Sequence, residues 1–150
     1  MNTIFKKLNY KNQALIHVIG APASFYTALD EMKEFTRICK SLGKGPIHFI
    51  LLFVKKQERL KTLVESLAPH LEGDALVWVA YPKKTSKQFK SDIHRDIAWE
   101  VMGQHDMEGV RIISIDEDWS ALRFRKVDFI KTMKRKSRIL TEKGHKKAEK

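Results

Sequence analysis

The sequence predicts an α/β fold, a three-layer Rossmann-like sandwich with a mainly parallel five-stranded sheet and an antiparallel last strand. Three observations predict it. Short apolar runs alternate with segments of helical spacing, which is typical of strands joined by crossover helices. The apolar run over 47–54 lacks polar alternation, as expected of a parallel strand buried on both faces. The link between the last two strands is too short for a crossover, so the final strand must reverse direction.

The first third of the chain contains one predicted strand and one predicted helix. Residues 14–19 form a short apolar run that ends at Gly20, which indicates a buried strand. Gly20 and Pro22 mark the turn that follows, since glycine permits unusual backbone conformations and proline fixes its own. Apolar side chains at helical spacing over 25–42 predict a helix, with Cys39 as a small buried residue on its apolar face.

The central third of the chain repeats this alternation. Residues 47–54 form the second predicted strand, and leucines three and four apart over 60–71 predict an amphipathic helix. A third strand is predicted over 75–81. Ser91 and Asp92 follow a polar loop, and we expect them to cap the next helix, because such side chains accept hydrogen bonds from the first helical turn.

Two predicted strands separated by an acidic turn complete the fold. The fourth strand is predicted over 110–115, the turn over 116–118 and the antiparallel fifth strand over 121–127. The sequence contains no internal repeat and no interdomain linker. We therefore predict one Rossmann-like domain over 1–130, followed by a basic, partly disordered tail over 131–150.

The charge of the chain is concentrated in that tail. The formal net charge is +11, and nine Lys or Arg against two Glu fall within 131–150. Runs of like charge are usually solvated tails without a partner. The alternative is a tail that attracts nucleic acid, because basic residues neutralise backbone phosphates. In that alternative, the candidate contacts are Lys134, Arg135, Lys136 and Arg138.

Composition excludes several classes of protein and indicates a location. The balance of apolar and charged residues is globular, which excludes collagen-like and wholly disordered chains. The longest apolar run, 49–54, is far shorter than the roughly 20 residues that cross a bilayer. The N-terminal residues have no signal-peptide core, and the single Cys39 fits a reducing compartment. We therefore expect a cytoplasmic protein without a membrane partner.

Two motifs resemble those of a known family. The Pro-Lys-Lys loop at 82–84, directly after a buried strand, and the Asp-Glu-Asp-Trp-Ser turn at 116–120 are the specific ones. With the rest of the chain up to about Lys131, they resemble a family of small bacterial proteins known only as a domain of unknown function. The resemblance implies a Rossmann-like sheet and implies no activity.

The predicted strand order also resembles the second half of a class I methyltransferase. Such enzymes place a glycine-rich turn after the first strand, so that the backbone can approach the cofactor closely. Here that turn has one glycine, Gly20, and Pro22 lacks an N–H donor. We also find no second strand that is followed by an acidic residue for the ribose. The sequence therefore predicts no bound cofactor, S-adenosylmethionine included.

The candidate site lies at the carboxyl edge of the sheet, where open parallel sheets bind ligands. If the last strand inserts beside the third, the lysine-rich loop after 81 faces the acidic turn 116–118. One interpretation is a set of exposed ion pairs, each worth about 0–1 kcal/mol. The other is a phosphate or carboxylate site that also uses a helix N-terminus. Its candidate residues are Lys83, Lys84, Thr85, Ser86, Ser91 and Trp119. Trp119 is either a stacking surface in that site or a core residue.

The function predicted from the sequence is a non-catalytic, or cofactor-degenerate, Rossmann-like module that binds an anionic ligand or partner at this edge. One alternative is a small methyltransferase-like transferase that uses the same edge. It requires a deep pocket between 20–24 and 83–84 with Trp119 as a wall. The other alternative is nucleic-acid binding through the basic tail. We predict no catalytic residue and no metal site, because the histidines lack zinc spacing and residues 116–118 point to alternating faces.

Overall fold

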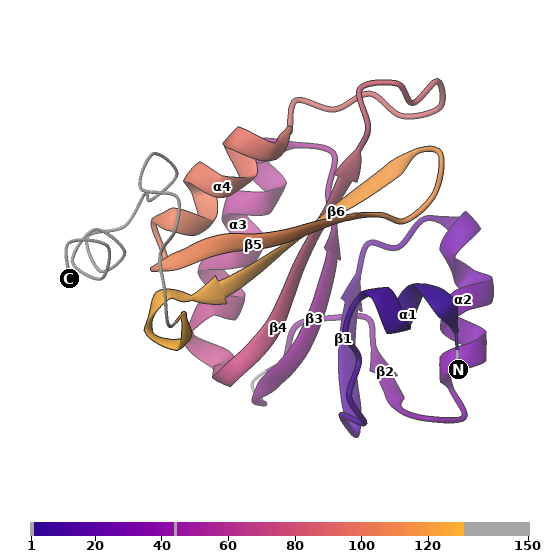
Figure 1. Ribbon diagram of the computed structural model, residues 1–150, viewed down its shortest axis with the longest axis vertical. Coiled ribbons are helices and arrows are strands. Elements are labelled where there is room, and N and C mark those ends of the chain that lie inside the picture. The colour runs from indigo at the N-terminus through magenta and orange to yellow at the C-terminus, as the bar shows by residue number, and fades with distance from the viewer. Residues whose placement is uncertain (1, 44, 131–150) are drawn as a thin grey trace.

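The computed structural model describes residues 2–43 and 45–130, which include one six-stranded sheet (Figure 1). Its strands are β1 (Leu15–Ile19), β2 (Arg37–Cys39), β3 (Ile47–Phe53), β4 (Leu71–Pro82), β5 (Met107–Ser114) and β6 (Trp119–Lys126). They lie in the order β2-β1-β3-β4-β6-β5. The first four strands pair in parallel, and β6 is antiparallel to both of its neighbours. The Rossmann-like class with a reversed last strand is confirmed; the predicted tail, 131–150, lies outside the described residues.

Helices cover both faces of the sheet and make three layers. They are α1 (Thr3–Lys7), α2 (Tyr26–Met32), α3 (Gln57–Leu67) and α4 (Arg95–Gly103), with single 3-10 turns at Ala23–Phe25, Ala68–His70 and Val127–Phe129. In Figure 1, α3 and α4 lie behind the sheet, and α1 and α2 lie in front of its β1 side. Within the described part of the chain, no helix is long and apolar enough to cross a membrane.

The helix predicted over 25–42 is wrong in its second half. The α2 helix ends at Met32, whose carbonyl accepts from the N–H groups of both Phe35 and Thr36. The chain then becomes extended, and the short strand β2 pairs in parallel with the start of β1. The hydroxyl of Thr36 anchors this entry by donating to the carbonyl of Gln13, at 2.8 Å. The sheet therefore has six strands rather than five, and Cys39 lies half-buried on an edge strand rather than on a helix.

Two apolar cores lie on opposite faces of the sheet. One packs α3 and α4 against alternate residues of β3, β4 and β6, and the other packs α1 and α2 against the remaining residues. Trp78 on β4 is fully buried, and its indole N–H donates to the carbonyl of Leu8, at 2.9 Å. That hydrogen bond fixes the N-terminal segment on the sheet. The central strands are therefore held rigidly beneath the loops at their carboxyl ends.

The position of β6 determines which loops are neighbours. This strand inserts between β4 and β5, so that Trp119 at its start lies opposite Pro82 at the end of β4. The sequence predicts this insertion only if the methyltransferase-like strand order holds, and that order is present. The loop after β4 and the turn before β6 therefore share one edge of the sheet.

Candidate functional site

Hydrogen bonds join the loop after β4 to the acidic turn before β6. The backbone N–H of Lys83 donates to the carbonyl of Asp118, at 2.7 Å. The hydroxyl of Ser86 donates to the Asp118 carboxylate, at 2.8 Å, and accepts from the N–H of Phe89, at 3.1 Å. The two motifs that the sequence predicts to be neighbours are therefore in direct contact.

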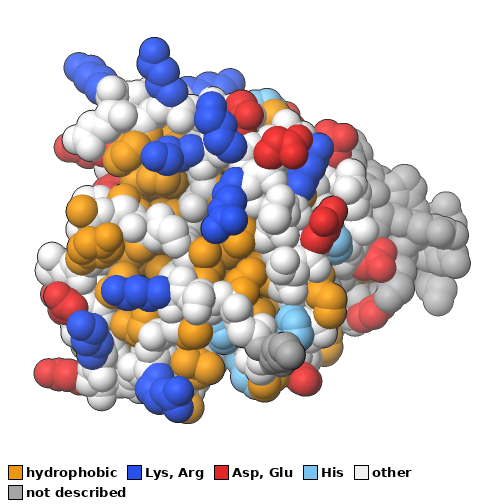
Figure 2. Space-filling model, turned by 180° about the vertical axis from the view of Figure 1, so that it is seen from behind, with side chains coloured by type: hydrophobic (Ala, Val, Ile, Leu, Met, Phe, Trp, Pro, Cys, Tyr) orange, Lys and Arg blue, Asp and Glu red, His pale blue; other side chains and the backbone are white. Residues whose placement is uncertain are grey.

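Six lysines lie in the two segments that follow β3 and β4 at this edge of the sheet. We call them the lysine rim: Lys55, Lys56, Lys83, Lys84, Lys87 and Lys90. Figure 2 shows Lys and Arg side chains gathered at the top of the molecule, the end at which Figure 1 places the loop after β4. The ammonium group of Lys83 donates to the Ser114 hydroxyl, at 2.6 Å, and that of Lys55 lies 5.4 Å from the centre of the Phe89 ring.

The acidic turn forms no ion pair with the lysine rim in the described structure. Among residues 2–43 and 45–130, the ion pairs join Lys33 to Asp30, Arg95 to Asp96 and Arg125 to Asp74, and none involves a rim lysine. The Asp116 carboxylate instead accepts from the N–H groups of Asp118 and Trp119, at 2.8 and 2.9 Å. These carboxylates are used to shape the turn, as Asp side chains commonly are. The first of the two interpretations, a set of exposed ion pairs between this loop and the acidic turn, is therefore not found among the described residues.

Of the three hydroxyl groups predicted for the site, those of Ser86 and Ser91 form hydrogen bonds with the protein. The Ser91 hydroxyl donates to the carbonyl of Lys55, at 2.9 Å, and accepts from the N–H of Ile93. Ser91 and Ser86 thus hold the loop in place, whereas Thr85 is exposed. The expectation that Ser91 and Asp92 cap α4 is wrong, because α4 begins at Arg95. The Asp92 carboxylate instead accepts from the N–H of Gln57, at 2.6 Å, and so caps α3.

Aromatic rings fill the space beneath the lysine rim. Trp119 is only 3% exposed, and its ring centre lies 5.2 Å from those of both Phe53 and Phe89. Phe25, from the turn after β1, lies 4.9 Å from Phe53. The structure thus places Trp119 in the core, the second of the two interpretations. The deep pocket required by the transferase alternative is occupied at this point by side chains.

The turn after β1 approaches β3 closely. Gly20 has a φ of +75°, and a Cβ atom there would lie 2.8 Å from the carbonyl oxygen of Phe53. Glycine is needed because the left-handed conformation and the neighbouring strand both exclude a side chain. The strand order reverses between β1 and β3, which is where open α/β sheets bind their ligands. At this reversal, Gly20 packs against protein.

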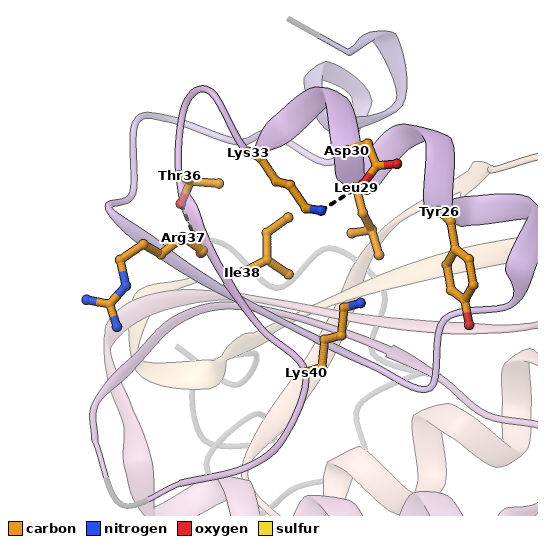
Figure 3. Close-up of a pocket in the computed structure, with 8 residues that line it drawn as sticks. All are labelled: Tyr26, Leu29, Asp30, Lys33, Thr36, Arg37, Ile38 and Lys40. Carbon is orange, nitrogen blue, oxygen red and sulfur yellow. Dashed lines mark hydrogen bonds and ion pairs between the residues drawn. The ribbon is translucent and has the colours of Figure 1, made fainter.

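A basic pocket lies beside the edge strand β2 (Figure 3). It has a volume of about 480 Å³ and is lined by Tyr26, Leu29, Asp30, Lys33, Thr36, Arg37, Ile38 and Lys40. Lys33 pairs with Asp30 at 2.9 Å, and the ammonium of Lys40 lies 5.7 Å from the centre of the Tyr26 ring. Figure 3 shows the Arg37 side chain pointing away from both lysines. The sequence does not indicate this pocket, because the residue pattern predicts a helix where β2 forms.

A second pocket, of about 390 Å³, opens on the face of β1 and β2 that α2 does not cover. We call it the His17 pocket; its lining is Gln13, Ala14, Leu15, His17, Cys39, Gly43, Gly45, Pro46 and His48. His17 is 5% exposed, and its Nδ1 atom is buried without a hydrogen-bond partner among the described residues. Burial lowers the pKa of His17, a backbone hydrogen bond with Phe49 opposes the shift, and nearby His48 adds to it. The imidazole is therefore held neutral.

Sequence comparisons identify no family. No protein-family model matches the chain, and no curated protein matches it in sequence. The sequence motifs resemble those of a family with a Rossmann-like, methyltransferase-like fold. The fold is confirmed by the structure, but no sequence family is identified.

Solved structures share the fold. The chain is similar to an S-adenosylmethionine-dependent methyltransferase from Aquifex aeolicus, with 13% identity over 82% of this chain and 87% of that one, and a TM-score of 0.56. It is also similar to the fibrillarin pre-rRNA processing protein of Methanococcus jannaschii, with 14% identity over 77% of this chain and 67% of that one, and a TM-score of 0.50. The chain is thus a Rossmann-like α/β domain with the architecture of methyltransferases. At this identity the likeness shows the fold alone.

The residues at the cofactor position of this fold do not fit S-adenosylmethionine. Gly20 is exposed, but it is the single glycine of the turn after β1, and Pro22 in the same turn lacks an N–H that could donate to a cofactor. A strand β2 does exist, against the expectation from the sequence, yet it is followed by Lys40 and not by a carboxylate that could bind a ribose.

Proposed function

We propose that this protein is a cofactor-degenerate, non-catalytic module of methyltransferase-like fold that binds a phosphate- or carboxylate-bearing ligand at the lysine rim. The observation that supports this proposal is the lack of ion pairs between the rim lysines and the acidic turn beside them, within the described residues. Cations that are held together and not neutralised by nearby carboxylates attract an external anion.

Lys83 and Lys84 are the centre of the proposed site. Pro82 ends β4, and the Lys83 N–H bond to Asp118 then fixes the direction of the loop. Lys84 and Thr85 are exposed, so an ammonium and a hydroxyl are available to the same ligand. Lysine attracts phosphate as a point charge and does not form the two parallel hydrogen bonds that arginine forms. We therefore expect modest affinity that weakens with added salt.

Ligand-induced thermal shifts and calorimetry test the rim directly. Inorganic phosphate, pyrophosphate and adenosine monophosphate are titrated into the full chain and into a Lys83→Gln/Lys84→Gln variant. A Lys6→Gln/Lys7→Gln variant is the control, because it removes the same charge from α1, away from the rim. We expect stabilisation by at least pyrophosphate, about tenfold weaker binding in the rim variant and wild-type binding in the control. Equal binding by all three proteins contradicts the proposal.

A small methyltransferase-like transferase is the second candidate, and the shared fold is the observation that favours it. The same titration with S-adenosylmethionine separates the two candidates. If S-adenosylmethionine alone stabilises the protein, the transferase replaces the binding module. The nucleic-acid role of Lys134, Arg135, Lys136 and Arg138 stays a prediction, since these residues lie outside the described part of the chain.

A further inference from the structure

Three arginines project from the same face of β5 and β6. Arg111 on β5 lies directly opposite Arg123 on β6. Arg125 lies two residues further along β6 and so shares the face of Arg123, because strand side chains alternate. Directly opposed side chains in an antiparallel pair lie about 4.5–5.5 Å apart at their Cβ atoms. The pairing therefore holds like charges together.

No described helix covers this face. In Figure 1, α3 and α4 lie behind β5 and β6, and α1 and α2 lie to the side, over the β1 half of the sheet. Trp78, opposite Arg123 on β4, is fully buried, whereas Arg111 is exposed. Arg123 is half-buried between them. The sheet face thus changes, across three strands, from closed core to open surface.

Only one of the three guanidinium groups has an ion-pair partner in the described structure. Arg125 binds the Asp74 carboxylate with two nitrogens, Nη2 at 2.6 Å and Nε at 3.1 Å. The Nε atom of Arg123 is buried and makes no hydrogen bond to any described residue. Burial lowers the pKa of Arg123, and the nearby charges of Arg125 and Arg111 add to the effect while Asp74 opposes it. Glu108 lies opposite Arg125 on β5, and its carboxylate accepts from the indole N–H of Trp99. Arg111 and Arg123 form no ion pair with any described residue.

An external oxyanion is the group that such a cluster fits best. The planar guanidinium matches a phosphate with two parallel hydrogen bonds, which lysine cannot do. The partner must also carry many negative charges, because nine more basic residues lie in the sequence over 131–150, after the last described residue, Ile130. A phosphodiester strand presents evenly spaced anions of this kind.

We propose that Arg111 and Arg123 contact successive phosphates of a nucleic-acid strand that lies across the open face of β5 and β6. This surface is separate from the lysine rim, and neither proposal depends on the other. The contacts are with the backbone, so the binding is independent of sequence and falls steeply as the salt concentration rises.

Fluorescence anisotropy of labelled oligo-dT, titrated with the full chain at several salt concentrations, tests this proposal. The variants are Arg111→Gln/Arg123→Gln and Arg123→Lys, with Arg37→Gln/Arg59→Gln as a control that removes the same charge from β2 and α3. We expect the double variant to flatten the slope of log affinity against log salt by about 1.4, or about 0.7 for each lost phosphate contact. Arg123→Lys should keep most of the slope, because it keeps the charge.

Arg111→Gln alone tests the exposed residue without disturbing the half-buried Arg123, so a folding defect in the double variant does not leave the proposal unresolved. Its slope should flatten by about 0.7.

A slope that falls as much in the control as in the double variant overturns the proposal, as does the absence of oligo-dT binding at low salt. Poly-glutamate that binds as tightly as oligo-dT, with the same dependence on Arg111, overturns the assignment to nucleic acid. A Lys83→Gln/Lys84→Gln variant should leave oligo-dT binding nearly intact, which separates this result from that of the lysine rim.

Discussion

The strand β1 borders two spaces that have opposite properties. At its carboxyl end, where this fold class holds its ligands, Gly20 packs on the Phe53 carbonyl and aromatic rings fill the space. At its middle, the His17 pocket stays open and holds a buried imidazole nitrogen without a described partner. Packed aromatic rings therefore lie at the end of β1 where this fold class binds ligands, and the His17 pocket lies in another part of the sheet.

The cause of the difference is the type of connection on each face. The link from β1 to β2 contains α2. Phe25, directly before this helix, packs on the ring of Phe53 beneath the lysine rim. The link from β2 to β3 spans only 40–46, and its described residues form no helix. A parallel connection usually needs a dozen or more residues and a helix that covers the sheet. Residues of this link, Gly43, Gly45 and Pro46, line the His17 pocket in place of a helix, and His17 itself is buried. The type of connection therefore differs between the packed and the hollow parts of the sheet.

The largest expected effect is on the filled side. Phe53→Ala removes the ring that links Phe25 to Trp119, and we expect the free energy of unfolding to fall by about 3–5 kcal/mol. Urea denaturation measures the change. Phe35→Ala is the control, because Phe35 is 50% exposed, and its loss should cost about 0.5 kcal/mol or less. Similar values for the two variants would mean that the space beneath the lysine rim is loosely packed and could admit a ligand.

The next largest effect distinguishes two reasons for glycine at position 20: its positive φ and its closeness to the carbonyl oxygen of Phe53. Gly20→Ala meets both a positive φ and an atom 2.8 Å from the new Cβ, whereas Gly73→Ala meets a φ of +55° with nothing within 4 Å. The left-handed conformation costs about 1–2 kcal/mol in each variant. We therefore expect Gly20→Ala to lower the free energy of unfolding by clearly more than Gly73→Ala does. Equal losses in urea denaturation would reduce Gly20 to an ordinary turn residue.

The sequence was sufficient for the parts of the fold that rest on strong local patterns. The unbroken apolar run of β3 predicts a central strand, and the short link before β6 predicts its reversal; both are confirmed. It was insufficient for β2, because the apolar residues of 35–42 continue the helical period of α2 although the chain there is extended. That strand is fixed by pairing with β1 and by the Thr36 bond to Gln13, which are contacts between distant residues.

Some features of the candidate site could also be predicted from the sequence, and others could not. The contact between the Pro-Lys-Lys loop and the acidic turn follows from topology, and it is present. The use of Asp116 and Asp118 within the turn, and of Asp92 as the cap of α3, depends on hydrogen-bond geometry that residue types alone do not determine. The cross-strand pair of Arg111 and Arg123 depends on a register that a bulge after Gly109 shifts, so alternation within β6 alone misses it.

The smallest expected effect concerns the open side of β1. The pKa of His17 in the folded protein lies below the 6.5 of the unfolded side chain, so the unfolded chain binds this proton more strongly. The free energy of unfolding is therefore unaffected by His17 well above pH 6.5, and it falls as the pH drops below that value towards the folded pKa. Urea denaturation across this range should show a shallower pH dependence for His17→Gln than for the wild type. His94→Gln is the matched control, because it removes a histidine from an exposed position. If His17→Gln has the wild-type pH dependence, burial does not favour the neutral imidazole, and the carboxyl end of β1 and its middle do not differ in electrostatics in this way.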